Sequence, residues 1–221
     1  MTKSGPVTDA IEMIASRMTA SGNSLAVLYH HSPHAWTFDG ASILRNVYDV
    51  MLQGLYIMVD VANRIERAQL YMDFMDVERM RFIKLIDSNG TDIAKYVSGS
   101  PKRLEAEPVM KQRYDAIKAR FTTKTGNVRD TWYAGSLREL AKASDLEQEY
   151  EMVQRILSAA VHSSPLTLKQ GPAVRQVPIM DWHWRFAFRI LGAYAEYKGV
   201  DLDEMEKYLV TSARRSVFNT S

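Results

Sequence analysis

The chain has 221 residues, of which 46% are hydrophobic and 24% are charged, a balance typical of a folded protein with an apolar core. Its net charge of +2 is too small for composition alone to indicate nucleic-acid binding. It has no cysteine, which excludes disulfides, thiolate metal sites and a cysteine nucleophile and suits a reducing compartment such as the cytoplasm.

Apolar spacing predicts long helices over the first half of the chain. A short helix is expected over residues 7–19, with its end at Ser21-Gly22-Asn23, and Pro33 marks a break within residues 30–34. Asp39 is expected to cap a helix over 40–61, and the capping-box pattern at 63–66 predicts a further helix that ends near Ser88. The apolar run 47–61 carries too many polar residues for a membrane span, so no membrane association is expected.

The second half continues the helical pattern. Helices are predicted over 106–120, over an aromatic stretch at 180–198 and over 201–213. Two capping-box patterns, Ser136-x-x-Glu139 and Ser144-x-x-Glu147, predict two helix starts eight residues apart, and Pro165 is expected to end the second helix. The sequence therefore predicts an all-α, single-domain bundle of about six to eight helices over residues 1–221, with about six flexible residues at its N-terminus.

The helix expected before Pro165 carries the main candidate site. Arg155, Ser158 and His162 lie at helical spacing on one face, and Arg155 and His162 are separated by about 10.5 Å along the axis. An imidazole titrates near neutrality and can act as a general acid or base, and a guanidinium can hold a phosphate. This row therefore suggests phosphate chemistry on RNA without a metal. The alternative is structural, with Arg155 in a salt bridge and His162 beside the helix C-terminus.

Other polar pairs could extend this site. Arg45 and Asp49 lie four residues apart on an apolar helix and could face Arg155 and His162 in one polar pocket, or form only an intrahelical ion pair. Arg67 and Tyr71 repeat the same spacing and could extend the pocket. The histidines at 30, 31 and 34 lack a helical His-x3-His pair, because Pro33 breaks the helix between His30 and His34, and the chain offers no thiol. No metal or other cofactor is therefore predicted.

The Arg155-x6-His162 motif at the end of a helix, in a small all-α protein, resembles the HEPN superfamily (higher eukaryote and prokaryote nucleotide-binding domain). The resemblance implies a metal-independent endoribonuclease or RNA-binding protein of a bacterial toxin–antitoxin or phage-defence system. It also implies a homodimer whose site forms where two motifs meet, with RNA and a cognate antitoxin or other protein as partners. Ile156 departs from the polar residue that often follows the arginine in active members.

A second resemblance covers more of the chain. Arg45-x3-Asp49, Arg67-x3-Tyr71 and Tyr150-x4-Arg155-x2-Ser158-x3-His162 look like the ordered motifs of a bacterial helical family of unknown function. This family brings no established activity with it. The catalytic candidates therefore stay those of the helix face, Arg155, Ser158 and His162. The binding candidates are Arg45, Asp49, Arg67, Tyr71 and Tyr150. The rival interpretation is a non-catalytic helical module that binds a protein or ligand and uses the same polar residues as a structural network.

Overall fold

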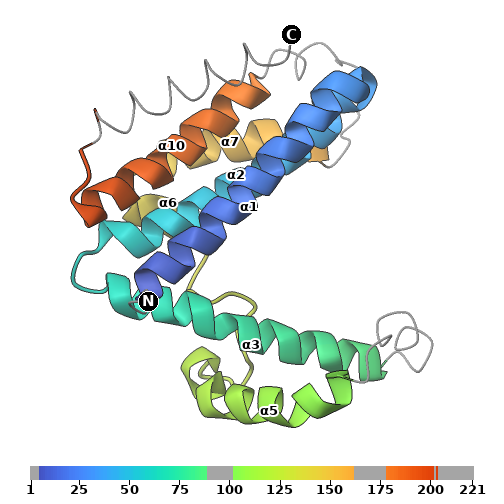
Figure 1. Ribbon diagram of the computed structural model, residues 1–221, viewed down its shortest axis with the longest axis vertical. Helices are drawn as coiled ribbons and strands as arrows, with labels where there is room; N and C mark the ends of the chain where they lie inside the picture. The colour runs from blue at the N-terminus through green and yellow to red at the C-terminus, as the bar shows by residue number, and fades with distance from the viewer. Residues whose placement is uncertain (1–4, 89–101, 162–177, 202, 204–221) are drawn as a thin grey trace. The chain divides into compact units, whose positions relative to one another are not determined.

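The structure, a computed structural model, describes residues 5–88, 102–161, 178–201 and 203 (Figure 1). Within these ranges the chain forms seven α-helices and one 3₁₀ helix, and its only strand-like pairing is an isolated bridge between Thr122 and Val128. The predicted all-α bundle is confirmed. Contacts divide the chain into two compact units, residues 1–64 with 135–221 and residues 65–134. One domain over 1–221 stays a prediction.

The first unit is organised around one central helix, α2 (Pro33–Val59). Four helices pack against it: α1 (Pro6–His31), α6 (Leu137–Ala143), α7 (Glu147–Val161) and α10 (Ile179–Lys198). The largest fully buried side chains of α2 are Leu44, Tyr48, Met51, Leu52 and Ile57. Burying a side chain of this size contributes about 1.5–3 kcal/mol, so burial on several sides makes α2 the core of this unit.

The second unit contains most of α3 (Arg64–Ser88), together with α5 (Lys102–Ile117) and the 3₁₀ helix η1 (Lys118–Phe121). Phe74 of α3 packs edge-on against Phe121 with ring centroids 5.3 Å apart. The Arg81 guanidinium donates to the backbone carbonyls of Val128 and Arg129 at 2.9 and 2.6 Å. These contacts tie the segment after η1 to α3.

Two predicted helix boundaries near the N-terminus are wrong. The helix does not end at residues 21–23 but continues through Gly22 to His31, because Leu25 extends its buried apolar stripe and one helical glycine costs only about 1 kcal/mol. Asp39 is not an N-cap, since α2 begins at Pro33. Proline suits the first helical position, where its missing N–H has no intrahelical role.

Other boundaries agree with the sequence. The helix α3 ends at Ser88, and α10 ends at Lys198 with Gly199 as its C-cap, whose φ of +66° is the left-handed conformation that glycine adopts freely. The region 106–120 is helical as predicted, but α5 begins earlier, at Lys102, and its last turn is continued by η1. The predicted end at Pro165 and nearly all of the predicted helix 201–213 lie outside the described residues.

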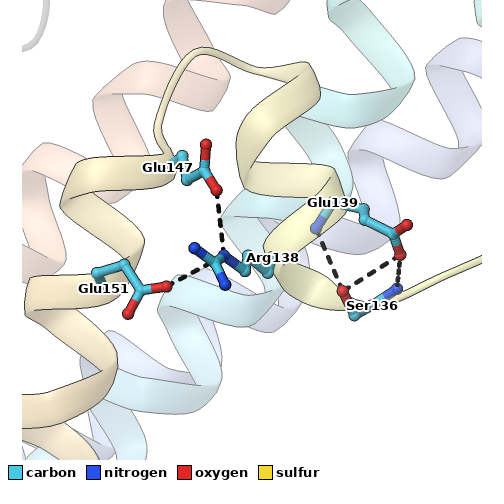
Figure 2. A network of polar contacts seen from close by, with 5 residues as sticks. All are labelled: Ser136, Arg138, Glu139, Glu147 and Glu151. Carbon is cyan, nitrogen blue, oxygen red and sulfur yellow. Dashed lines mark hydrogen bonds and ion pairs between the residues drawn. The ribbon is translucent and has the colours of Figure 1, made fainter.

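Of the two capping boxes predicted at Ser136 and Ser144, only the one at Ser136 forms. The Ser136 Oγ accepts from the Glu139 backbone N–H, and the Glu139 carboxylate accepts from the Ser136 backbone N–H at 2.6 Å (Figure 2). Ser144 instead ends α6, and its buried Oγ has no hydrogen-bond partner among the described residues. The chain turns at Asp145 with φ of 57°, which separates Ser144 from the start of α7. The second capping box was therefore a wrong prediction.

These two serines make a matched pair for a stability measurement. Ser136→Ala removes a cap that satisfies an orphan backbone donor, so we expect the free energy of unfolding in urea to fall by about 1 kcal/mol. Ser144→Ala removes a buried hydroxyl without a partner in the described part of the chain and should leave that free energy unchanged or raise it by up to about 1 kcal/mol. An equal fall in the free energy of unfolding of both variants would contradict this assignment of the caps.

Candidate functional site

A chain of polar contacts joins α2 and α7. The Gln154 side-chain amide of α7 donates to the Asp49 carboxylate of α2 at 3.2 Å, and the Ser158 hydroxyl donates to the Gln154 amide oxygen at 3.3 Å. Ser158, Gln154 and Tyr150 are spaced four residues apart and therefore follow one face of α7. We call Arg45, Asp49, Tyr150, Gln154 and Ser158 the Asp49 cluster.

Asp49 is the electrostatic centre of this cluster. Burial, which disfavours the charged carboxylate, raises its pKa from an ordinary 3.8 to about 6. The positive charge of Arg45, four residues earlier on α2, and the hydrogen bond from Gln154 both act in the opposite direction without cancelling the effect. Asp49 can consequently gain or lose a proton close to neutral pH, which an exposed aspartate does not do.

Two tyrosines form the apolar side of the cluster. The Tyr150 ring stacks on Tyr48 with centroids 6.4 Å apart, and Tyr48 packs in turn on Phe186 of α10 at 4.9 Å. Tyr48 is fully buried, and among the described residues its hydroxyl has no hydrogen-bond partner. Burial raises the pKa of both tyrosines, so both remain neutral phenols near Asp49 at physiological pH.

Ion pairs fix the N-terminal half of α7. The Arg189 guanidinium of α10 donates to both Glu149 carboxylate oxygens, at 2.5 and 2.8 Å. On α6, Arg138 lies 3.1 Å from carboxylate oxygens of both Glu147 and Glu151 (Figure 2). The bidentate Glu149 pair has the geometry that gives the strongest side-chain hydrogen bonds, so α7 is firmly oriented on the bundle.

The residues predicted to share one face of α7 differ in their exposure to solvent. Arg155 is exposed and has no ion pair among the described residues, whereas Ser158 is half-buried and points into the Asp49 cluster. His162 lies outside the described residues. The structure thus brings Ser158, Asp49, Arg45 and Tyr150 together, with Arg155 on the solvent side of the same helix.

The sequence did not reveal Gln154. Glutamine is an ordinary helix residue, and only its contact with Asp49, 105 residues away in the chain, gives it a place in the cluster. The one local signal was its spacing of four residues from both Tyr150 and Ser158.

Arg67 and Tyr71 lie on α3 in the second unit. The Tyr71 ring packs edge-on against the Trp132 ring with centroids 5.5 Å apart, so part of its surface serves the packing of that unit. Participation of Arg67 and Tyr71 in the same site as Asp49 stays a prediction.

The histidine segment between α1 and α2 does not form a metal site in the part of the chain that the structure describes. His30 and His31 are exposed in the last turn of α1, and the His30 ring packs against Tyr29. Within the described ranges no three histidine, aspartate or glutamate side chains lie close enough to hold a metal ion. No helix in these ranges is both long and apolar enough to cross a membrane.

The fold and the cluster define the class of the protein as an all-α bundle with a half-buried acidic centre between α2 and α7. The sequence profile of the family of unknown function DUF5677 matches residues 13–171, well over half of the chain, which therefore belongs to this family. The match includes α2 and α7 and thus the whole Asp49 cluster. No curated protein and no solved structure matches the chain. The resemblance to the HEPN superfamily stays a prediction.

Proposed function

We propose that this protein binds RNA and cleaves it without a metal ion, at the solvent side of α7. The observation that carries the proposal is the state of Arg155. Its neighbours on α7, Glu147, Glu149 and Glu151, are engaged with arginines of α6 and α10, while Arg155 is exposed and has no ion pair in the described part of the chain. An exposed guanidinium on a firmly oriented helix can donate two parallel hydrogen bonds to a phosphate.

The proposed roles combine this geometry with the sequence motif. Arg155 holds the scissile phosphate and stabilises the negative charge of the transition state. His162, two turns further along the sequence, exchanges protons with the 2′-hydroxyl and the leaving 5′-oxygen. Ser158 connects the outer side of α7 to Asp49 through Gln154, and we assign it a positioning role. Arg45, Asp49 and Tyr150 support that connection.

The proposed setting follows from the HEPN resemblance. The active form is a homodimer in which two Arg155/His162 motifs face each other, in the bacterial cytoplasm, with a cognate antitoxin or a phage-defence partner controlling it. Sedimentation equilibrium of the purified chain is the direct measure of the homodimer.

The experiment that tests the activity is RNA cleavage by purified protein in EDTA. Structured and single-stranded RNAs of mixed sequence are incubated with wild type, Arg155→Ala and His162→Ala, and folding of each protein is followed by circular dichroism. Cleavage by wild type that is lost in both folded variants supports the proposal. Absence of cleavage by wild type across these RNAs would reject it.

A second function has an observation of its own in its favour. The chain from Ser158 through Gln154 to Asp49 links hydrogen-bonding groups of one subunit to each other, as a structural network does. A non-catalytic helical module that binds a protein or ligand would need no more than this. If the protein is such a module, wild type should not cleave RNA. Replacing Gln154 by alanine should then lower the free energy of unfolding and have no effect on RNA.

A further inference from the structure

Lysine side chains gather in the second unit, where α3 meets α5 and η1. The Lys84 ammonium of α3 lies 5.2 Å from the centroid of the Tyr114 ring on α5, and the Lys118 ammonium of η1 lies 5.9 Å from the same centroid. Lys111 precedes Tyr114 by three residues and therefore shares its face of α5. All three lysines are exposed, and we call Lys84, Lys111 and Lys118 the lysine cluster.

One carboxylate accompanies these three lysines. Asp115 accepts a hydrogen bond from Lys118 Nζ at 2.8 Å. This bond lowers the pKa of Asp115, and the positive charges of Lys118, Lys111 and Lys84 lower it further. Lys84 and Lys111 make no ion pair with any described residue. Two of the three positive charges in the lysine cluster therefore have no carboxylate to compensate them.

The sequence around the lysine cluster concentrates positive charge. Residues 111–129 contain six lysines and arginines and one acidic residue, Asp115, which is a net charge of +5, whereas all 221 residues together carry +2. Arg120 is compensated by an ion pair with Asp73 of α3, but Lys124 is exposed and has no ion pair with the described residues. A local excess of exposed positive charge attracts polyanions, and the composition of the whole chain hides this excess.

The layout of the lysine cluster favours a polymer over a small anion. Lys111 and Lys118 are seven residues apart on the continuous run of α5 and η1, about 10 Å along its axis, and Lys84 comes from another helix. Charges distributed in this way match the repeated phosphates of a nucleic-acid strand. An anionic membrane surface is a poorer match, because the apolar residues of α5 are not gathered on one face.

We propose that the lysine cluster binds the phosphate backbone of RNA. The inference deepens the RNA binding proposed above and rests on it, but it does not depend on cleavage at α7. Contacts of Lys84 and Lys118 with the Tyr114 ring restrict two ammonium groups before RNA arrives, which reduces the entropy lost on binding. Phosphate contacts carry no base information, so binding through this surface should be insensitive to base sequence.

The test measures the fluorescence anisotropy of a short labelled single-stranded RNA with 2′-O-methyl riboses, which lacks the hydroxyl that transesterification requires and so stays intact. Wild type is compared with Lys84→Gln/Lys111→Gln, which removes the two uncompensated lysines and keeps side chains that suit a helix. We expect about 10- to 100-fold weaker binding at about 50 mM salt. The slope of log binding constant against log salt concentration should become shallower by about 1.4, which is about 0.7 for each lost contact.

Two further variants keep the test independent of a general loss of folding, which circular dichroism monitors. Arg17→Gln/Lys142→Gln removes two exposed cations from the first unit and should bind within about twofold of wild type. Asp115→Asn removes the carboxylate beside the lysine cluster and frees Lys118, so it should tighten RNA binding by about 2- to 10-fold. A misfolded protein would not give such a gain.

The outcomes separate this inference from the proposed function. Equal binding by wild type and folded Lys84→Gln/Lys111→Gln would overturn the inference and leave RNA binding at α7 in place. Binding that depends on the lysine cluster, with no cleavage by wild type, would uphold the inference and reject the cleavage. Binding of wild type to phosphatidylserine vesicles but to no RNA would assign the surface to a membrane and overturn both.

Discussion

Replacing Arg155 by alanine is expected to lower the rate of RNA cleavage in EDTA at least about 100-fold, because the variant loses the cation that stabilises the developing charge on the phosphate. His162→Ala should lower the rate by about 10²–10⁴-fold, the usual range for a lost general acid or base. Arg155→Ala should lower the free energy of unfolding by no more than about 0.5 kcal/mol, since Arg155 is exposed and makes no ion pair with the described residues.

Arg17→Ala is a matched control for Arg155→Ala. Arg17 is an exposed arginine on α1, so its replacement removes the same charge from another helix of the first unit. It should leave the cleavage rate within about twofold of wild type. The salt dependence of RNA binding separates binding from catalysis. Loss of one phosphate contact should make the negative slope of log binding constant against log salt concentration shallower by about 0.7 for single-stranded RNA. Equal rates for wild type and folded Arg155→Ala would contradict the proposed role of Arg155.

Asp49→Asn is expected to raise the free energy of unfolding by about 1–3 kcal/mol at pH 8. Burial raises the pKa of Asp49 to about 6, so the folded protein binds a proton that the unfolded chain, with an ordinary value of 3.8, releases. Wild-type stability therefore falls as the pH rises through the interval from about 3.8 to about 6, and the charged carboxylate remains a cost at pH 8. Asparagine has the same shape, carries no charge and can still accept from Gln154.

The check is urea unfolding of wild type and Asp49→Asn at pH 4, 6 and 8. The difference between the two proteins should be largest at pH 8 and close to zero at pH 4, where Asp49 is mostly protonated in the folded state. Arg45→Met is the complementary variant, because it removes the charge that lowers the Asp49 pKa. It should reduce stability at pH 8 more than at pH 4. A difference that does not vary with pH would contradict the assigned burial of Asp49.

The raised pKa of Asp49 also bears on function. A carboxyl that titrates near pH 6 at a cost in stability is the kind of group that functional sites retain. If the Asp49 cluster positions Ser158 for catalysis, Asp49→Asn should be more stable yet less active than wild type. If the cluster is purely structural, the same variant should be more stable with no change in any binding activity.

Local signals located most elements but not all of their ends. Pro33 and Gly199 marked real boundaries, since the fixed φ of proline and the left-handed φ of glycine act within the residue itself. Gly22 was predicted to end a helix and Ser144 to cap one on equally good local signals, but neither does so in the structure. At Gly22 the helix continues because Leu25 extends its buried apolar stripe, and at Ser144 a turn through Asp145 moves the hydroxyl away from α7.

The sequence by itself determined the all-α class, because its helical periodicity and few turn residues act at short range. It also determined the polar spacing of Arg45 with Asp49 and of Tyr150 with Ser158, which places each pair on one helix face. Only the tertiary structure decided that Gln154 reaches Asp49, that Arg155 faces solvent and that His183 of α10 hydrogen-bonds to the Met18 carbonyl of α1. The physical reason is that helix rotation and pairing depend on contacts between residues 105 and 165 positions apart, which no local pattern encodes.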